Sequence, residues 1–169
     1  MTSNDMPRCE ALNRQGNSLL EIARIKHGKE ADEFFKAAGA AYTEALQLNP
    51  DMAETRVGLG CARLALASRT LDAAKRDGLL RQARETLLAA ERLDAKAAAY
   101  NLACAEALAG DVAQCRFWLE RCKATLHLPP VEQLRADPDL ASVRGEPWFG
   151  GAACLMDCSA PRGAARAAN

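Results

Sequence analysis

Gly60-Cys-Ala-Arg-Leu64 opens a stretch of sequence that closes with Ala90-Glu-Arg-Leu-Asp-Ala95. The same pattern occurs earlier in the chain, where Gly16-Asn-Ser-Leu-Leu20 opens a stretch that closes with Ala45-Leu-Gln-Leu-Asn-Pro50, at an offset of 44 to 45 residues. A third and shorter copy occupies residues 103–127. Self-similarity at a fixed period of this size is typical of repeat proteins that stack into a solenoid.

Six segments carry apolar residues at spacings of three and four, which is the periodicity of an amphipathic helix. They lie around residues 12–25, 34–46, 59–66, 79–90, 100–107 and 115–122. Asn49-Pro50-Asp51 ends the second segment, because proline cannot continue a helix and pushes the preceding residue to extended geometry. Gly110-Asp111 supplies a turn before the sixth segment, and Pro129-Pro130 closes it. The pattern predicts an all-α fold.

The three copies resemble tetratricopeptide repeats. In the second copy, Leu59-Gly60 falls where that family places the Leu-Gly pair of its helix A. The small, large and small residues that the family places on helix B are matched by Ala83, Leu87 and Ala90 in the second copy; Ala38, Tyr42 and Ala45 in the first; Cys115, Leu119 and Cys122 in the third. The resemblance spans roughly residues 12–130.

The resemblance implies a right-handed superhelical solenoid of three antiparallel helical hairpins, closed by a C-terminal capping helix. We expect a single domain over residues 8–149 between flexible termini at 1–7 and 150–169. Within it, the repeats are expected at 8–50, 52–95 and 96–128, and the cap at 130–149.

The copies differ in length. We compare the distance along the chain from the small residue of helix A to the small residue of helix B. In the third copy it runs from Ala103 to Cys115, which is the usual spacing of the family. In the first and second copies it is longer, covering residues 16–38 and 60–83. Ten or eleven extra residues, split over two helices, lengthen each helix by roughly 8 Å at 1.5 Å per residue. The extra segments, 26–31 and 68–77, are charged and should project beyond the third hairpin at one edge.

The segment after Pro130 is expected to close the solenoid. It is similar to a closing segment often seen after bacterial repeats of this type. The last hairpin of a solenoid leaves an apolar side open, so terminal capping is required. The apolar residues available to cover that side are Leu134, Leu140, Val143, Trp148 and Phe149.

Composition excludes several classes of protein. Lys+Arg and Asp+Glu are both 22, so the chain lacks the basic balance that nucleic-acid binding normally requires. No stretch reaches the roughly 18 to 20 apolar residues of a membrane span, and the first residues contain no apolar core of a secretory signal. Seven cysteines without a signal peptide are expected to be reduced thiols. We therefore expect a cytoplasmic protein whose partner is a protein or peptide.

The sequence offers little support for catalysis, and we expect neither enzyme activity nor a cofactor or metal. His27 and His127 are predicted to be surface residues. Cys154 and Cys158 have three residues between them but no second pair, as a structural zinc site would need. Four further cysteines match repeat positions: Cys115 and Cys122 match core positions, whereas Cys61 and Cys104 follow the small residue of successive A helices and either line a groove or are simply buried.

The resemblance also implies that the A helices line a concave groove. The residues implied are Asn13, Asn17, Leu20 and Glu21 in the first repeat; Val57, Cys61 and Leu64 in the second; Tyr100, Asn101, Cys104 and Leu108 in the third. The alternative for each is packing against a neighbouring helix. Repeats that clamp the carboxylate tail of heat-shock chaperones use Lys and Arg with two Asn. Here Asn17 matches one Asn, but Asn13, Gly58, Ala97 and Asn101 stand in the other places, so no chaperone-tail binding is expected.

The leading hypothesis is a binding module, either an adaptor, a scaffold or a chaperone, that holds a peptide or protein segment in this groove. Gly58-Leu-Gly-Cys-Ala-Arg63 resembles dedicated chaperones for secreted translocators, although the extended hairpins depart from them, and plant-type organelle import receptors have similarly extended hairpins. Two alternatives belong to other classes. One is a thiol- or metal-dependent accessory protein, and the other is a structural protein that associates with further copies of itself.

Overall fold

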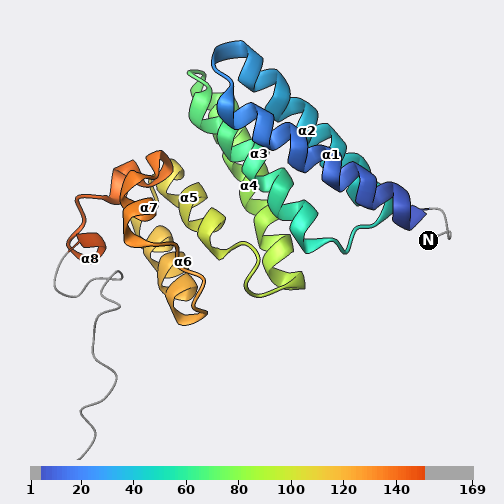
Figure 1. Ribbon diagram of the computed structural model, residues 1–169. Coiled ribbons are helices and arrows are strands. Elements are labelled where there is room, and N and C mark those ends of the chain that lie inside the picture. The colour runs from blue at the N-terminus through green and yellow to red at the C-terminus, as the bar shows by residue number, and fades with distance from the viewer. Residues whose placement is uncertain (1–4, 151–169) are drawn as a thin grey trace, which may run out of the picture.

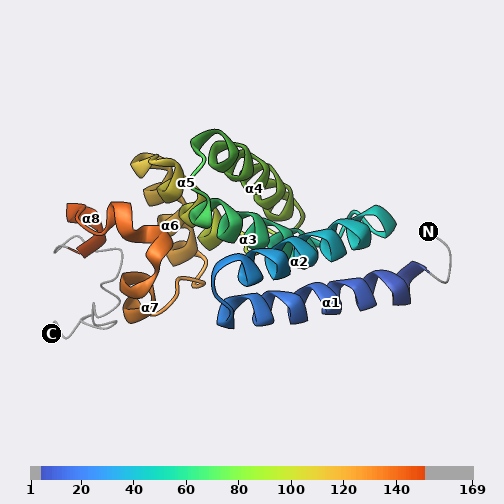
Figure 2. The same ribbon diagram turned by 90° about the horizontal axis from the view of Figure 1, so that it is seen from above.

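The computed structural model describes residues 5–150, and every regular element in that range is helical (Figures 1 and 2). The order is α1 (Asp5–Ile25), α2 (Gly28–Leu48), α3 (Ala53–Arg69), α4 (Ala73–Leu93), α5 (Ala99–Ala109), α6 (Val112–Ala124), α7 (Val131–Ala136), the 3₁₀ helix η1 (Pro138–Val143) and α8 (Pro147–Gly150). The all-α prediction is confirmed. The helix α1 begins before residue 8, so residues 5–7, expected to belong to a flexible terminus, are helical.

Consecutive helices pack as pairs. The closest packing is between α1 and α2, α3 and α4, and α5 and α6, while α2 with α3 and α4 with α5 join one pair to the next. The first helices of the pairs also touch, α1 with α3 and α3 with α5. Figure 1 shows α1–α4 as long neighbouring helices, with α5–α8 gathered at one end of them.

The first two hairpins are longer than the third. Helices α1, α2 and α4 have 21 residues each and α3 has 17, whereas α5 and α6 have 11 and 13. Each long helix is therefore longer than its counterpart in the third hairpin by about 9 to 15 Å at 1.5 Å per residue, somewhat more than the roughly 8 Å expected from the spacing. The turns of the two long hairpins contact each other, since the Arg69 guanidinium bonds Asp32 at 2.5 Å and the Gly28 carbonyl at 3.0 Å.

The turns follow from local chemistry. Gly28 and Gly110 take positive φ angles of 58° and 81°, which cost glycine no steric strain. Asp72 and Asp111 cap α4 and α6 by accepting the backbone N–H of the residue three positions on, at 3.1 and 3.0 Å. The helix α2 follows His27, whose side chain makes no such bond. The predicted turn at Gly110-Asp111 is confirmed.

Glycines on the A helices receive large side chains from the B helices. A Cβ atom at Gly16 or at Gly58 would lie 2.5 Å from the ring of Tyr42, and one at Gly60 would lie 2.5 Å from Leu87. Tyr42 and Leu87 are fully buried. The ring of Tyr42 therefore lies between α1 and α3, and this close approach explains why both repeats carry a residue without a side chain there.

The segment after Pro130 shares one core with the second and third hairpins. Leu134, Leu140, Val143 and Phe149 are buried in it, and Trp148 is half-buried against it. Instead of one capping helix, the segment consists of α7, η1 and α8, and the Asp137 side chain starts η1 by accepting the Asp139 N–H at 2.9 Å. Both tryptophans lie in this part of the molecule: Trp118 is buried on α6, and the Arg116 guanidinium lies 6.0 Å from the ring of Trp148.

Candidate binding groove

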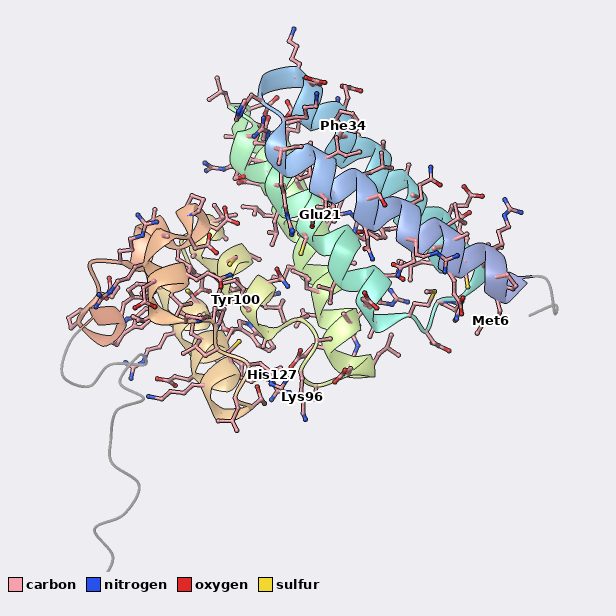
Figure 3. All side chains as sticks on the ribbon, viewed as in Figure 1. Met6, Glu21, Phe34, Lys96, Tyr100 and His127 are labelled. Carbon is pink, nitrogen blue, oxygen red and sulfur yellow. The ribbon has the colours of Figure 1, made fainter. Side chains whose placement is uncertain are left out.

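A groove runs along the A helices and ends at the segment 131–143. It consists of two adjoining pockets of about 290 and 210 Å³ that share Leu20, Arg24 and Cys61. The larger pocket reaches Tyr100 and Asp139 at one end, and the smaller reaches Asn17 and Val57 at the other. We call this cavity the A-helix groove. Figure 3 shows Glu21 on α1, at one end of the groove, and Tyr100 on α5, at the other.

Nine of the eleven residues predicted for the groove line these two pockets: Asn17, Leu20, Glu21, Val57, Cys61, Leu64, Tyr100, Asn101 and Cys104. Leu20, Leu64 and Cys104 are at most 6% exposed, so they form its floor and serve the core at the same time. The remaining two lie elsewhere. Asn13 accepts a hydrogen bond from the buried Thr55 hydroxyl at 2.9 Å, which ties α1 to α3, and Leu108 packs against the core of the third hairpin.

The sequence prediction did not include the contribution of the capping segment. Gln133, Asp137 and Asp139 also line the larger pocket. The sequence placed these residues in the closing segment but did not indicate on which side of α5 they would lie. Arg24 of α1, which lines both pockets, was also missed because it is polar and close to the end of its helix.

The capped end of the groove is acidic. The Tyr100 hydroxyl donates to Asp137 Oδ2 at 2.5 Å, and the Cys104 thiol lies 3.9 Å from the same oxygen. Burial, with the neighbouring charge of Asp137, raises the pKa of Asp139 to about 6. Among residues 5–150, no lysine or arginine makes an ion pair with either carboxylate. The groove therefore presents uncompensated negative charge at this end.

The thiols of the groove are held in their protonated form. Burial raises the pKa of Cys61 to about 11, and its Sγ donates to the Asn101 side-chain oxygen at 3.2 Å. The pKa of Cys104 is also raised, first by burial and then by the charge of Asp137. The ligand atoms of Cys104, Asp137 and Asp139 lie within 4.8 Å of one another, so a divalent ion could contact all three.

At the opposite end some polar groups have partners, whereas the Glu54 carboxylate, which also lines the smaller pocket, makes no ion pair with a described residue. Arg24 donates to Glu21 at 2.6 Å, and Asn17 accepts the Tyr42 hydroxyl at 2.7 Å. The amide nitrogen of Asn17 faces no described acceptor and stays available to a ligand. The groove thus carries an unpaired carboxylate at this end and two neighbouring ones, Asp137 and Asp139, at the capped end.

Among the residues that the structure describes, the remaining histidines and cysteines lie outside the groove. His27 and His127 are exposed, and Cys115 and Cys122 are buried, as predicted. The five cysteines of the described range are free thiols, and Cys154 and Cys158 lie outside the described residues. Between residues 5 and 150, no helix has the length and apolar character that a membrane crossing requires.

No protein-family model matches the sequence, and comparisons with curated proteins and with solved structures find no match.

Proposed function

We propose that this protein is a protein–protein interaction module with a tetratricopeptide-like solenoid of three hairpins, and that it binds a peptide or protein segment in the A-helix groove. Three features support the proposal: paired helices in three successive units, glycines that receive Tyr42 and Leu87, and one groove lined by the first helix of each pair. Helical grooves with apolar floors and side-chain amides at the rim suit extended or helical peptides.

The charge at the capped end of the groove indicates which kind of segment it binds. Asp139 lines the groove beside Asp137, is partly desolvated, and has no cationic partner within the described chain. A lysine or arginine side chain of a ligand would supply the missing charge, because a charge-assisted hydrogen bond to a carboxylate is stronger than a neutral one. The segment that binds is therefore expected to carry a basic residue that lies at the capped end.

Selection of random displayed peptides on the full-length protein tests this proposal. We expect the selected sequences to share a Lys or Arg, and Asp139→Asn to lower their affinity about tenfold while the matched control Asp51→Asn, at an exposed turn, leaves it unchanged. Glu21→Trp, an exposed position at the other end of the groove, should also block binding. Peptides that bind all three variants as well as the wild type would contradict groove binding.

A second candidate function rests on Cys104, Asp137 and Asp139. One sulfur and two carboxylate oxygens form a ligand set that Zn²⁺ accepts, and metal binding would deprotonate the thiol despite its raised pKa. Elemental analysis of protein purified without a tag distinguishes this candidate. Stoichiometric zinc that is lost in Cys104→Ser and kept in Cys61→Ser, whose sulfur lies in the same pocket but outside the cluster, would favour it over the peptide.

A further inference from the structure

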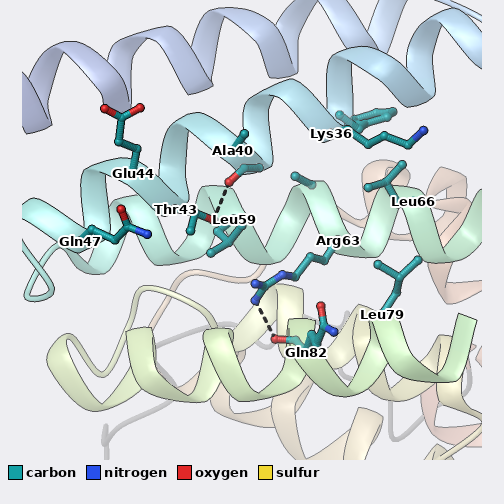
Figure 4. Close-up of a pocket in the computed structure, with 13 residues that line it drawn as sticks. Lys36, Ala40, Thr43, Glu44, Gln47, Leu59, Arg63, Leu66, Leu79 and Gln82 are labelled. Carbon is teal, nitrogen blue, oxygen red and sulfur yellow. Dashed lines mark hydrogen bonds between the residues drawn. The ribbon is translucent and has the colours of Figure 1, made fainter. Parts of the chain in front are cut away.

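A second groove lies on the other side of α3. Its two walls are α2 and α4, which both pack on α3, and its floor is the face of α3 that carries Leu59, Arg63 and Leu66 (Figure 4). The cavity has a volume of about 640 Å³ and continues into an adjoining pocket of about 450 Å³, with Lys36, Leu66 and Leu79 shared by both. We call the two together the α2–α4 groove.

The α2–α4 groove opens on a different face of α3 from the A-helix groove, although α3 and the buried Phe35 line both. Cys61 and Leu64 face the A-helix groove, whereas Arg63 and Leu66, two positions further along in each case, face the α2–α4 groove. Residues two apart on an α-helix point about 200° away from each other. The two grooves therefore lie on opposite faces of one helix and can be occupied independently.

The surface of this groove is apolar toward the adjoining pocket and polar at the opposite end, where Thr43, Glu44 and Gln47 line it. Leu66 and Leu79 are half-buried in it, and fully exposed Leu71 stands at the far end of the adjoining pocket. On α2 the wall includes Gly39 and Ala40, whose small size permits close approach of another backbone. A groove between two helices, with apolar side chains on its floor and on the α4 wall, suits an incoming helix.

The charge of the groove is unbalanced. Two of its cations already have partners, since Lys36 bonds Glu33 at 2.6 Å and Arg69 bonds Asp32 at 2.5 Å. Lys75 and Arg63 have none: within residues 5–150, neither has a carboxylate oxygen within 4 Å of its side-chain nitrogens. The carboxylate of Glu44, which also lines the groove, is paired with Arg8 at 2.5 Å, so the groove presents two uncompensated positive charges beside its leucines.

Arg63 is the residue best placed to meet a ligand. Its Nη1 donates to the Gln82 carbonyl at 3.1 Å and to the Thr86 hydroxyl, which fixes the guanidinium against α4. The Nε and Nη2 donors have no acceptor among the described residues. Burial lowers the pKa of Arg63, an effect partly offset by the more distant Glu85. A half-buried guanidinium with free donors and no anion is a ready partner for a carboxylate.

We propose that the α2–α4 groove docks an amphipathic α-helix of a partner protein, and that an Asp or Glu of that helix pairs with Arg63. Apolar side chains three or four positions from the acid would contact Leu66 and Leu79, and one further turn would reach Leu71. The partner helix is therefore acidic and apolar, in contrast to the basic segment expected in the A-helix groove. This inference does not depend on the function proposed for that groove.

The test uses a display library of stable helical scaffolds with randomised surface positions, selected on the full-length protein. We expect enriched helices to carry Asp or Glu three or four residues from Leu, Ile or Met. Their affinity should fall at least tenfold in Arg63→Met, which keeps the length of the side chain, and in Ala40→Trp, which fills the groove from an exposed position. The matched control Arg92→Met, at an exposed arginine outside the groove, should bind normally, and so should Asp139→Asn.

Three results would overturn the inference. The first is the absence of any enriched helix. The second is enrichment of helices without acidic residues, or of helices whose binding is equal in Arg63→Met and wild type. The third is a dimer by sedimentation that dissociates in Ala40→Trp, since that would make a second copy of this chain the occupant. Loss of binding in Asp139→Asn with retention in Arg63→Met would assign the selected helices to the A-helix groove.

Discussion

The second and third hairpins carry a similar apolar pattern, yet their first helices differ in exposure. The helix α3 lines the A-helix groove with one face and the α2–α4 groove with another, whereas α5 packs against α4, α6 and η1, keeps residues 102–107 buried and reaches the A-helix groove near its first turn. Even the charged Glu106 is only 4% exposed, and it pairs with Arg84 at 2.6 Å. The comparison teaches that two helices with a similar apolar pattern can differ in exposure, because the segment after Pro130 folds over the second of them.

The largest expected effect is a loss of folding stability in the first two hairpins. Tyr42→Ala should lower the free energy of unfolding by about 3–5 kcal/mol, because it empties the space between Gly16 and Gly58 and removes the bond to Asn17. Tyr42→Phe, the matched control, should cost only about 0.5–1.5 kcal/mol. Urea denaturation gives both values, and hydrogen exchange should show early loss of protection in α1–α3 with α5 and α6 retained. Equal loss of protection in all helices would mean that the hairpins unfold as one unit.

A smaller expected effect is a pH dependence of folding stability, which arises at Asp139 in the segment that covers the third hairpin. The pKa of Asp139 is raised to about 6 in the folded chain, above its ordinary value, so the folded state binds this proton more tightly than the unfolded state. Ionisation of Asp139 then lowers stability as the pH rises from about 4 through about 6. Asp139→Asn should stabilise the protein near neutral pH by about 1 kcal/mol, with solvent screening allowed for, and should make no difference below about pH 4. Urea denaturation at both pH values measures it, and a destabilised variant near pH 7 would show that the carboxylate is needed by the cap.

The smallest expected effects on stability come from the residues that precede the first turn of each helix. Asp72 and Asp111 cap α4 and α6, but His27 makes no capping bond for α2. His27→Asp should therefore raise stability by about 0.5–1 kcal/mol, and Asp111→Ala should lower it by about 1 kcal/mol. Thermal unfolding of the two variants at neutral pH provides the measurement. No gain in His27→Asp would indicate that the positive φ of Gly28 holds the carboxylate away from the N–H groups.

The sequence predicted well what depends on local pattern. The helix breaks near Pro50 and Gly110, the burial of Cys115 and Cys122, and the capping role of Leu134 and Leu140 all follow from periodicity or turn chemistry. It could also predict which residues of the A helices share a face, because that depends only on spacing along a helix.

The features that were missed depend on how segments distant in sequence meet. Asp139 reaches the A-helix groove only because the chain after Pro130 turns back over α5, a direction that no local pattern encodes. The α2–α4 groove arises because α2 and α4 pack on α3 without filling the space between them, so Arg63 looks like an ordinary surface residue in the sequence. Asn13 was placed in the groove because its hydrogen bond to Thr55 of the next repeat was not apparent.

The shared position of the two tryptophans has a practical consequence. Trp118 and Trp148 are the only tryptophans of the chain, and both belong to the unit formed by the third hairpin and its cap. Indole emission therefore reports the melting of that unit, while the far-ultraviolet circular dichroism signal reports mainly the four long helices. A difference between the two melting curves would measure how cooperatively the ends of this protein are joined, without any label or substitution.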